Sequence, residues 1–143
     1  YTFGLDGVMQ ANHFIRHARV DNLDLIPAID VEHSPRNKYS KDKKYIKKVI
    51  EELQKLEQTM FDYYGVHPII YTNRDCYTLY IKNHFPENLI WMSDLHSEPT
   101  IEDNEWVIWQ FSHTGQLNGA FGDIDLNYFR YSYRQFDKLI IGK

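Results

Sequence analysis

Short apolar runs alternate along this chain with segments of helical periodicity, and this alternation constrains the fold more than any other feature. We predict strands at residues 25–32, 67–72, 89–92, 106–111 and 124–126. We predict helices at residues 6–18, 40–64, 74–81 and 128–139. Strands that alternate with helices favour an α/β fold with a parallel sheet and helical crossovers. The segments that connect the last three strands contain little predicted helix, so we expect an incomplete helical layer there.

The longest helix is predicted at residues 40–64. Its apolar side chains recur every three or four residues and form one stripe, made of Ile46, Val49, Ile50, Leu53, Leu56, Met60, Phe61 and Tyr64. Ser40 is a plausible N-cap, and Gly65 is a suitable stop. The lysines near its start, at positions 41, 43, 44, 47 and 48, are expected to form a solvated face.

Composition limits the partners of the chain. A net charge of −4 argues against binding to nucleic acid, because that binding normally requires a basic excess. No apolar run approaches the ~20 residues that cross a bilayer, so we expect no membrane partner. An aromatic content of 15% is often found in acidic domains that bind sugar rings, but packing of the aromatic residues in a core is the more common explanation. The chain opens on Tyr1 without a basic leader and resembles the interior of a longer protein.

Polar or aromatic side chains stand at the end of every predicted strand. They are Asp30 and Glu32, Tyr71, Trp91, Trp109 and Gln110, and Asp125. In an α/β barrel the catalytic groups gather at the carboxyl ends of the strands. The recurrence therefore predicts a site at the mouth of a barrel. The residues from Gly115 to Gly122 contain neither a dinucleotide-binding nor a P-loop pattern, which argues against nucleotide binding.

The sequence Asp30-Val31-Glu32 places two carboxylates on the same side of one strand, about 6.6 Å apart along the backbone. Two carboxylates this close raise each other's pKa, so one can stay protonated while the other stays charged. That combination suits a general acid beside an electrostatic stabiliser. A loop cap or an ion site would use the same residues.

Other chemistry has weaker support in the sequence. His13 and His17 have a spacing that can hold a metal, but no third ligand is evident, so we predict no metal site and no cofactor. Cys76 lacks a partner base and is predicted to be inert, since the neighbouring Asp75 would raise its pKa. A serine nucleophile elbow is absent from the sequence.

The strand-end motifs, taken in order, resemble glycoside hydrolase family 25, the lysozymes that cleave peptidoglycan. The matching segments cover nearly the whole chain: residues 1–3, 10–14, 27–32, 68–72, 89–92, 106–112 and 125–129, with Gly115 and Gly119. The resemblance implies a modified TIM-like barrel of five βα units and three further strands. It also implies an N-acetylmuramidase, a hydrolase of the β-1,4 bond between N-acetylmuramic acid and N-acetylglucosamine.

Carried over by position, Glu32 is similar to the catalytic acid of the family. Asp30 resembles its neighbouring acid, and Asp125 resembles the acid on the last strand. The residues expected to line the sugar groove are Tyr1, Tyr71, Trp91, Trp109 and Gln110.

Two features depart from the family pattern. Thr2 stands where the family usually has histidine, which affects one wall of the groove. The first two to three strands of the barrel, including one that ends in an essential aspartate, have no counterpart in residues 1–143. We therefore expect a single catalytic domain representing the C-terminal two-thirds of a family 25 barrel, inactive and poorly folded when isolated.

Two rival functions remain open at this stage. A chitinase-like glycosidase also ends a strand in Asp-x-Glu, but it would need aspartates where Ala28 and Leu25 stand. A non-catalytic module that binds cell-wall glycan would use the aromatic residues without cutting a bond. In the leading interpretation the partner is bacterial peptidoglycan, and the protein acts outside the cell as a secreted enzyme or as a phage lysin.

Overall fold

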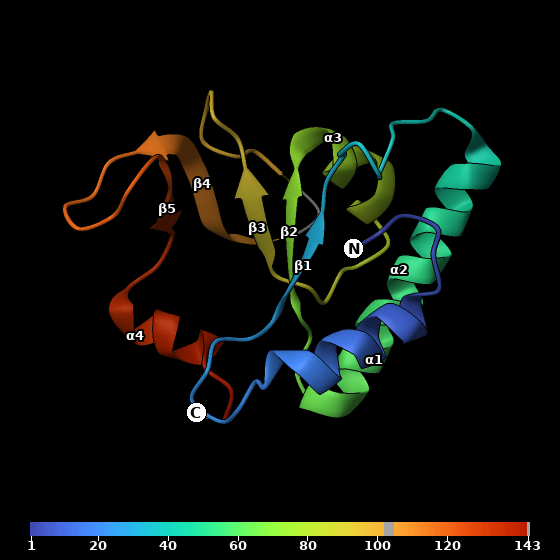
Figure 1. Cartoon of the computed structure of the whole chain (residues 1–143), viewed down its shortest axis with the longest axis horizontal. Coiled ribbons are helices and arrows are strands. Elements are labelled where there is room, and N and C mark those ends of the chain that lie inside the picture. Colours follow the sequence, from blue (N-terminus) through green and yellow to red (C-terminus); the bar gives the residue numbers. More distant parts are fainter. Residues whose placement is uncertain (102–104, 143) are drawn as a thin grey trace.

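The computed structural model describes residues 1–101 and 105–142 (Figure 1). The helices are α1 (Gly7–Ala18), α2 (Lys43–Tyr64), α3 (Arg74–Cys76) and α4 (Tyr133–Phe136), with a π-helical turn η1 (Tyr77–Ile81) and a 3₁₀ turn η2 (Asp137–Leu139). The strands are β1 (Ala28–Val31), β2 (Ile69–Asn73), β3 (Ile90–Ser93), β4 (Trp106–Gly115) and β5 (Ile124–Phe129). All five predicted strands are therefore present.

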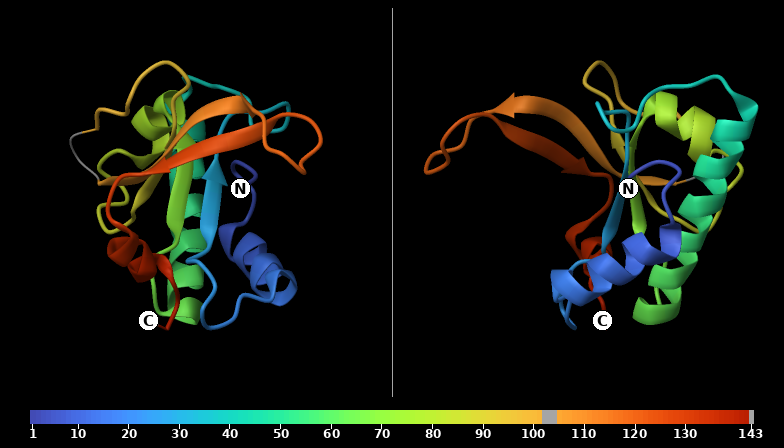
Figure 2. Two further views of the ribbon diagram at one scale, coloured as in Figure 1. Left: turned by 90° about the vertical axis from the view of Figure 1, so that its left-hand side faces the viewer. Right: turned by 45° about the vertical axis from the view of Figure 1, so that its right-hand side comes forward.

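The five strands form one sheet in chain order, β1-β2-β3-β4-β5. The pairs from β1 to β4 are parallel, as the alternation predicted, whereas β5 runs antiparallel to β4. Residues 116–123, which connect β4 to β5, are too few for a crossover, because a parallel connection needs about a dozen residues or more. The chain therefore turns back as a hairpin, which projects beyond the rest of the sheet (Figure 2).

The sheet is open, so the described residues do not form the closed barrel that the resemblance implied. In the sheet order β1 and β5 occupy the two edges. The architecture that the structure establishes is a mixed α/β fold with a five-stranded sheet.

Helix α2 packs its apolar stripe against the sheet and supplies much of the core. Val49, Leu53 and Met60 of this stripe are buried, as predicted. The predicted N-cap was wrong, because the cap lies two residues later, where the side chain of Asp42 accepts a hydrogen bond from the backbone of Lys44 at 2.9 Å. The C-terminal stop is confirmed, since Gly65 adopts a left-handed conformation with φ of 71°.

Helix α1 crosses α2 in very close contact. Gly7, at the start of α1, has no space for a side chain, because a Cβ atom there would lie 1.9 Å from the backbone oxygen of Glu52. The backbone N–H of Gly7 also donates a hydrogen bond of 2.9 Å to the Glu52 carboxylate. The contact fixes α1 and the segment before it relative to α2.

The helix predicted at residues 128–139 was wrong in its first half. Tyr128 and Phe129 belong to β5, where they pair with Trp109 and Ile108 of β4. Pairing with a neighbouring strand satisfies their backbone groups and overrides the local helical pattern. Helical structure begins only at α4. In the described part of the chain, no helix is long and apolar enough to cross a membrane.

Candidate active site

The strand register places the predicted site residues on one face of the sheet. Ile29 and Val31 of β1 are buried in the core with α2, so Asp30 between them points to the opposite side, which we call the open face. Asp30 is in register with Tyr71, and Tyr71 with Trp91. Residues in register across parallel strands share a face, so these three side chains form one row on the open face.

The two carboxylates at the end of β1 lie on this face. Asp30 is exposed, whereas Glu32 is half-buried just beyond the last strand residue. Partial burial raises the pKa of Glu32 above its ordinary value, and the negative charge of Asp30 raises it further. Burial also raises the pKa of Asp30. For Glu32, a raised pKa is the direction that the role of a general acid requires.

A third carboxylate approaches from the other edge of the sheet. Asp125 lies on β5, and strand alternation puts it on the same face as Asn127. Four strand spacings separate β1 from β5, about 19 Å across a flat sheet. The negative charge of Asp125 nevertheless contributes to the raised pKa of Glu32, because the sheet is strongly curled.

Hydrogen bonds link the polar and aromatic residues of the open face. The hydroxyl of Tyr71 donates to Oε1 of Gln110 at 2.7 Å, and Gln110 is buried. The indole Nε1 of Trp91 donates to Oδ1 of Asn127 at 2.8 Å. The rings of Tyr71 and Trp91 meet edge to face, with centroids 5.2 Å apart. Sequence reasoning missed Asn127, although its position two residues after Asp125 on one strand could have indicated it.

Trp109 does not share the open face with Tyr71 and Trp91. Trp109 is in register with the buried Met92 and packs against the core, and its Nε1 donates to the Asp94 carbonyl at 2.7 Å. Simple alternation would put Trp106 and Trp109 on opposite faces. The register between β3 and β4 shifts by one residue, because Ile90 pairs with Trp106 whereas Trp91 pairs with Ile108. This irregularity breaks the alternation and turns both tryptophans toward the core.

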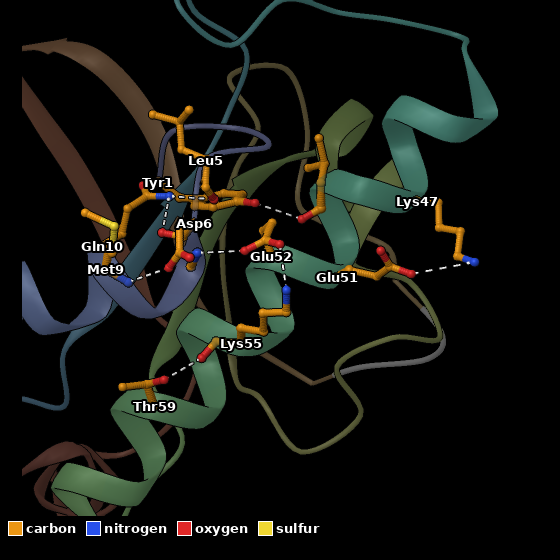
Figure 3. A network of polar contacts seen from close by, with 12 residues as sticks. Tyr1, Leu5, Asp6, Met9, Gln10, Lys47, Glu51, Glu52, Lys55 and Thr59 are labelled. Atoms are coloured by element: carbon orange, nitrogen blue, oxygen red, sulfur yellow. Dashed lines mark hydrogen bonds and ion pairs between the residues drawn. The ribbon is translucent and has the colours of Figure 1, made fainter.

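The ring of Tyr1 also points away from the open face, toward α2. Its hydroxyl donates to the Val49 carbonyl of α2 at 2.8 Å, and the ring packs against the core (Figure 3). The backbone nitrogen of Tyr1 donates to the Asp30 carbonyl of β1 at 2.9 Å. Tyr1 therefore supports the end of β1 and leaves the open face to the other predicted residues.

A cleft of about 770 Å³ borders the site at the free edge of β1. Its lining is largely apolar and includes Leu5, Met9 and Phe14 beside Ala28 and Asp30. Leu5 and Met9 are exposed, by 57% and 72%. The edge strand and the apolar side of α1 thus lack a covering element among the described residues.

The weaker candidates play no part in this face. The rings of His13 and His17 lie side by side on α1, tilted by 33° with centroids 4.3 Å apart. Among residues 1–101 and 105–142, no three potential metal ligands gather in one place. Cys76 is fully buried, and burial raises the pKa of its thiol to about 12, which agrees with the predicted inert cysteine.

An open face that carries three carboxylates at strand ends, beside aromatic and amide side chains, is typical of α/β enzymes that cleave carbohydrates. The chain belongs to glycosyl hydrolases family 25, whose model matches residues 3–120. This finding confirms the resemblance seen in the sequence motifs.

Solved structures agree with the family assignment. A family 25 glycosyl hydrolase from Bacillus anthracis is 31% identical, with a TM-score of 0.78 over 93% of this chain and 62% of that protein. A bacterial lysozyme from Streptomyces coelicolor, 21% identical, shares the fold with a TM-score of 0.80 over 94% of this chain and 66% of its own.

The uncharacterized protein YegX of Escherichia coli K12 is 27% identical over 135 residues. The match covers 94% of this chain but 47% of YegX, so the chain spans about half the length of this curated relative.

Proposed function

We propose that this chain forms the C-terminal part of a peptidoglycan hydrolase that cleaves the β-1,4 bond between N-acetylmuramic acid and N-acetylglucosamine. The observation that carries the proposal is the acid pair at the end of β1, where Glu32 has a raised pKa beside Asp30. Family membership and the muramidases and lysozymes among the structural neighbours support this substrate class.

In the proposed reaction Glu32 is the general acid. It transfers its proton to the glycosidic oxygen as the bond from that oxygen to the anomeric carbon breaks. Positive charge then develops on the sugar ring, and the carboxylates of Asp30 and Asp125 stabilise it from two edges of the curled sheet. Addition of water at the anomeric carbon completes hydrolysis, and the acid is restored to its protonated form.

Tyr71, Trp91, Gln110 and Asn127 form the floor on which the glycan would lie. Their hydrogen bonds to one another hold the aromatic edges and the amides in fixed positions, which lowers the entropy cost of binding a sugar. Trp91 is half-buried, so part of its ring is free to contact an apolar sugar face.

The same proposal includes a closed barrel in the complete enzyme. The open edge of β1, its apolar cleft and the exposed apolar side chains of the hairpin would be covered by further strands. Leu117 and Phe121, exposed by 64% and 104%, lie in this hairpin. Action on the bacterial wall places the enzyme outside the producing cell, or in a phage lysin.

The decisive test uses purified peptidoglycan and the full-length protein. Digestion, borohydride reduction and mass spectrometry identify which sugar carries the new reducing end. Reduced muramic acid is expected, with none from a Glu32→Gln control. Reduced glucosamine, or hydrolysis of chitin oligomers in place of peptidoglycan, would contradict the assigned bond. Pelleting with the wall without release of any fragment would indicate a binding module.

A further inference from the structure

Asn37 is a buried polar residue directly beneath the end of β1. Its side chain is 7% exposed, and each polar atom of its amide has a partner. The two N–H groups of Nδ2 donate to the carbonyls of Tyr1 at 2.7 Å and Glu32 at 3.2 Å. Oδ1 accepts from the backbone N–H of Phe3 at 2.9 Å. One amide therefore joins the Tyr1–Phe3 segment to the main chain of Glu32.

This connection matters because Glu32 has little other support. The register between β1 and β2 ends at Val31 and Thr72, so Glu32 lies beyond the sheet ladder. Within the described residues its carboxylate accepts no hydrogen bond, which leaves it free to donate a proton but also free to move. The direction of the side chain then depends on how its backbone is held.

The backbone of Asn37 is fixed in turn by a compact loop. Its N–H donates to Oγ of Ser34 at 3.1 Å, and its carbonyl accepts from the N–H of Ser34 at 3.0 Å. The amide orientation is unambiguous, because Phe3 offers a donor whereas Tyr1 and Glu32 offer carbonyl acceptors. Asparagine is the residue that supplies two donors and one acceptor on an arm this short.

We propose that Asn37 is a positioning residue for the general acid: its amide holds the Glu32 backbone so that the carboxyl group meets the glycosidic oxygen. This inference rests on the proposed function. Asn37 does not touch the substrate and acts through Glu32 alone. A displacement of about 1 Å at a reacting group can cost about 10²-fold in rate, so loss of the amide should appear in kcat.

The experiment compares two buried asparagines in the full-length protein. Asn88 is 4% exposed and donates from Nδ2 to Glu57 at 3.1 Å and to the Pro68 carbonyl at 2.9 Å. Asn88 lies two residues before β3, at the opposite end of the strands from Glu32 and about 15 Å away by strand rise. Asn88→Ala is therefore a matched control that removes similar hydrogen bonds far from Glu32.

We expect Asn37→Ala to lower kcat on peptidoglycan about 10- to 100-fold, with KM changed less than about threefold. Asn37→Asp keeps the acceptor for Phe3 but sets a carboxylate against two carbonyls, and is expected to be no better. Asn37→Ser retains one donor and keeps the test informative if the other variants unfold. Asn88→Ala should lower the melting temperature about as much as Asn37→Ala does. It should leave kcat within about twofold of the wild-type value.

Combination with Glu32→Gln separates positioning from stability. If Asn37 acts through Glu32, adding Asn37→Ala to Glu32→Gln lowers the residual rate by less than about twofold. The same fold loss in both backgrounds, or a full kcat for Asn37→Ala, would overturn the positioning role while leaving the proposed function intact. A near wild-type rate for Glu32→Gln alone would instead overturn the proposed function, and the positioning role with it.

Discussion

Replacement of Gly7 by alanine tests the closest contact in the structure. The new Cβ atom would lie 1.9 Å from the backbone oxygen of Glu52 and 2.8 Å from the backbone nitrogen of Leu56. Neither atom belongs to a flexible side chain, so α1 must move away from α2. Overpacking of this kind costs about 1–3 kcal/mol, and the loss of the Gly7 hydrogen bond to the Glu52 carboxylate adds about 1.5–3 kcal/mol.

The higher helix propensity of alanine offsets less than about 1 kcal/mol of this, because Gly7 is the first residue of α1, which leaves a net destabilisation of about 3 kcal/mol. For a domain of this size we expect the melting temperature to fall by about 10 °C, measured by circular dichroism on the full-length protein. The matched control is Gly65→Ala. Gly65 has φ of 71°, and a Cβ atom added there would meet no other atom within 4 Å, so only backbone strain of about 1–2 kcal/mol applies. A fall of less than about 3 °C for Gly7→Ala, or a larger fall for Gly65→Ala, would refute the close-packing argument.

Three further predictions concern the site. Glu32→Gln should lower turnover at least about 10²-fold in a wall-turbidity assay, and near wild-type lysis would remove Glu32 from the acid role. Because folding raises the pKa of Glu32, its ionisation opposes folding: stability is lost as pH rises from the ordinary carboxyl pKa of about 4 through the raised value. Glu32→Gln should therefore raise the melting temperature at pH 7 but not at pH 3, and calorimetry showing equal shifts at both would contradict the burial argument. Trp91→Phe removes the hydrogen bond to Asn127. It should lower kcat/KM for soluble glycan fragments about 3- to 10-fold, mainly by raising KM. An unchanged KM would exclude Trp91 from the groove.

Local pattern was sufficient to predict several features of this protein. The stripe on α2 follows from a period of 3.6 residues, and the strands follow from short apolar runs, since both depend on neighbours in sequence. The placement of Asp30 and Glu32 on one side of a strand likewise needs only the two-residue repeat. Family membership could also be read from the order of these motifs, and the family model confirms it.

Tertiary structure decided the features that depend on distant partners. Trp109 turned to the core because a register shift against β3 broke the two-residue repeat, and nothing near Trp109 in sequence encodes that shift. Tyr128 and Phe129 adopt a strand conformation because their backbone groups pair with those of β4. Asn37 joins Glu32 to Tyr1 and Phe3, and Asn127 accepts from Trp91; the bonds to Tyr1, Phe3 and Trp91 each span more than thirty positions. Sequence periodicity sets which face a residue prefers within its own element, but only the pairing of elements determines what that face meets.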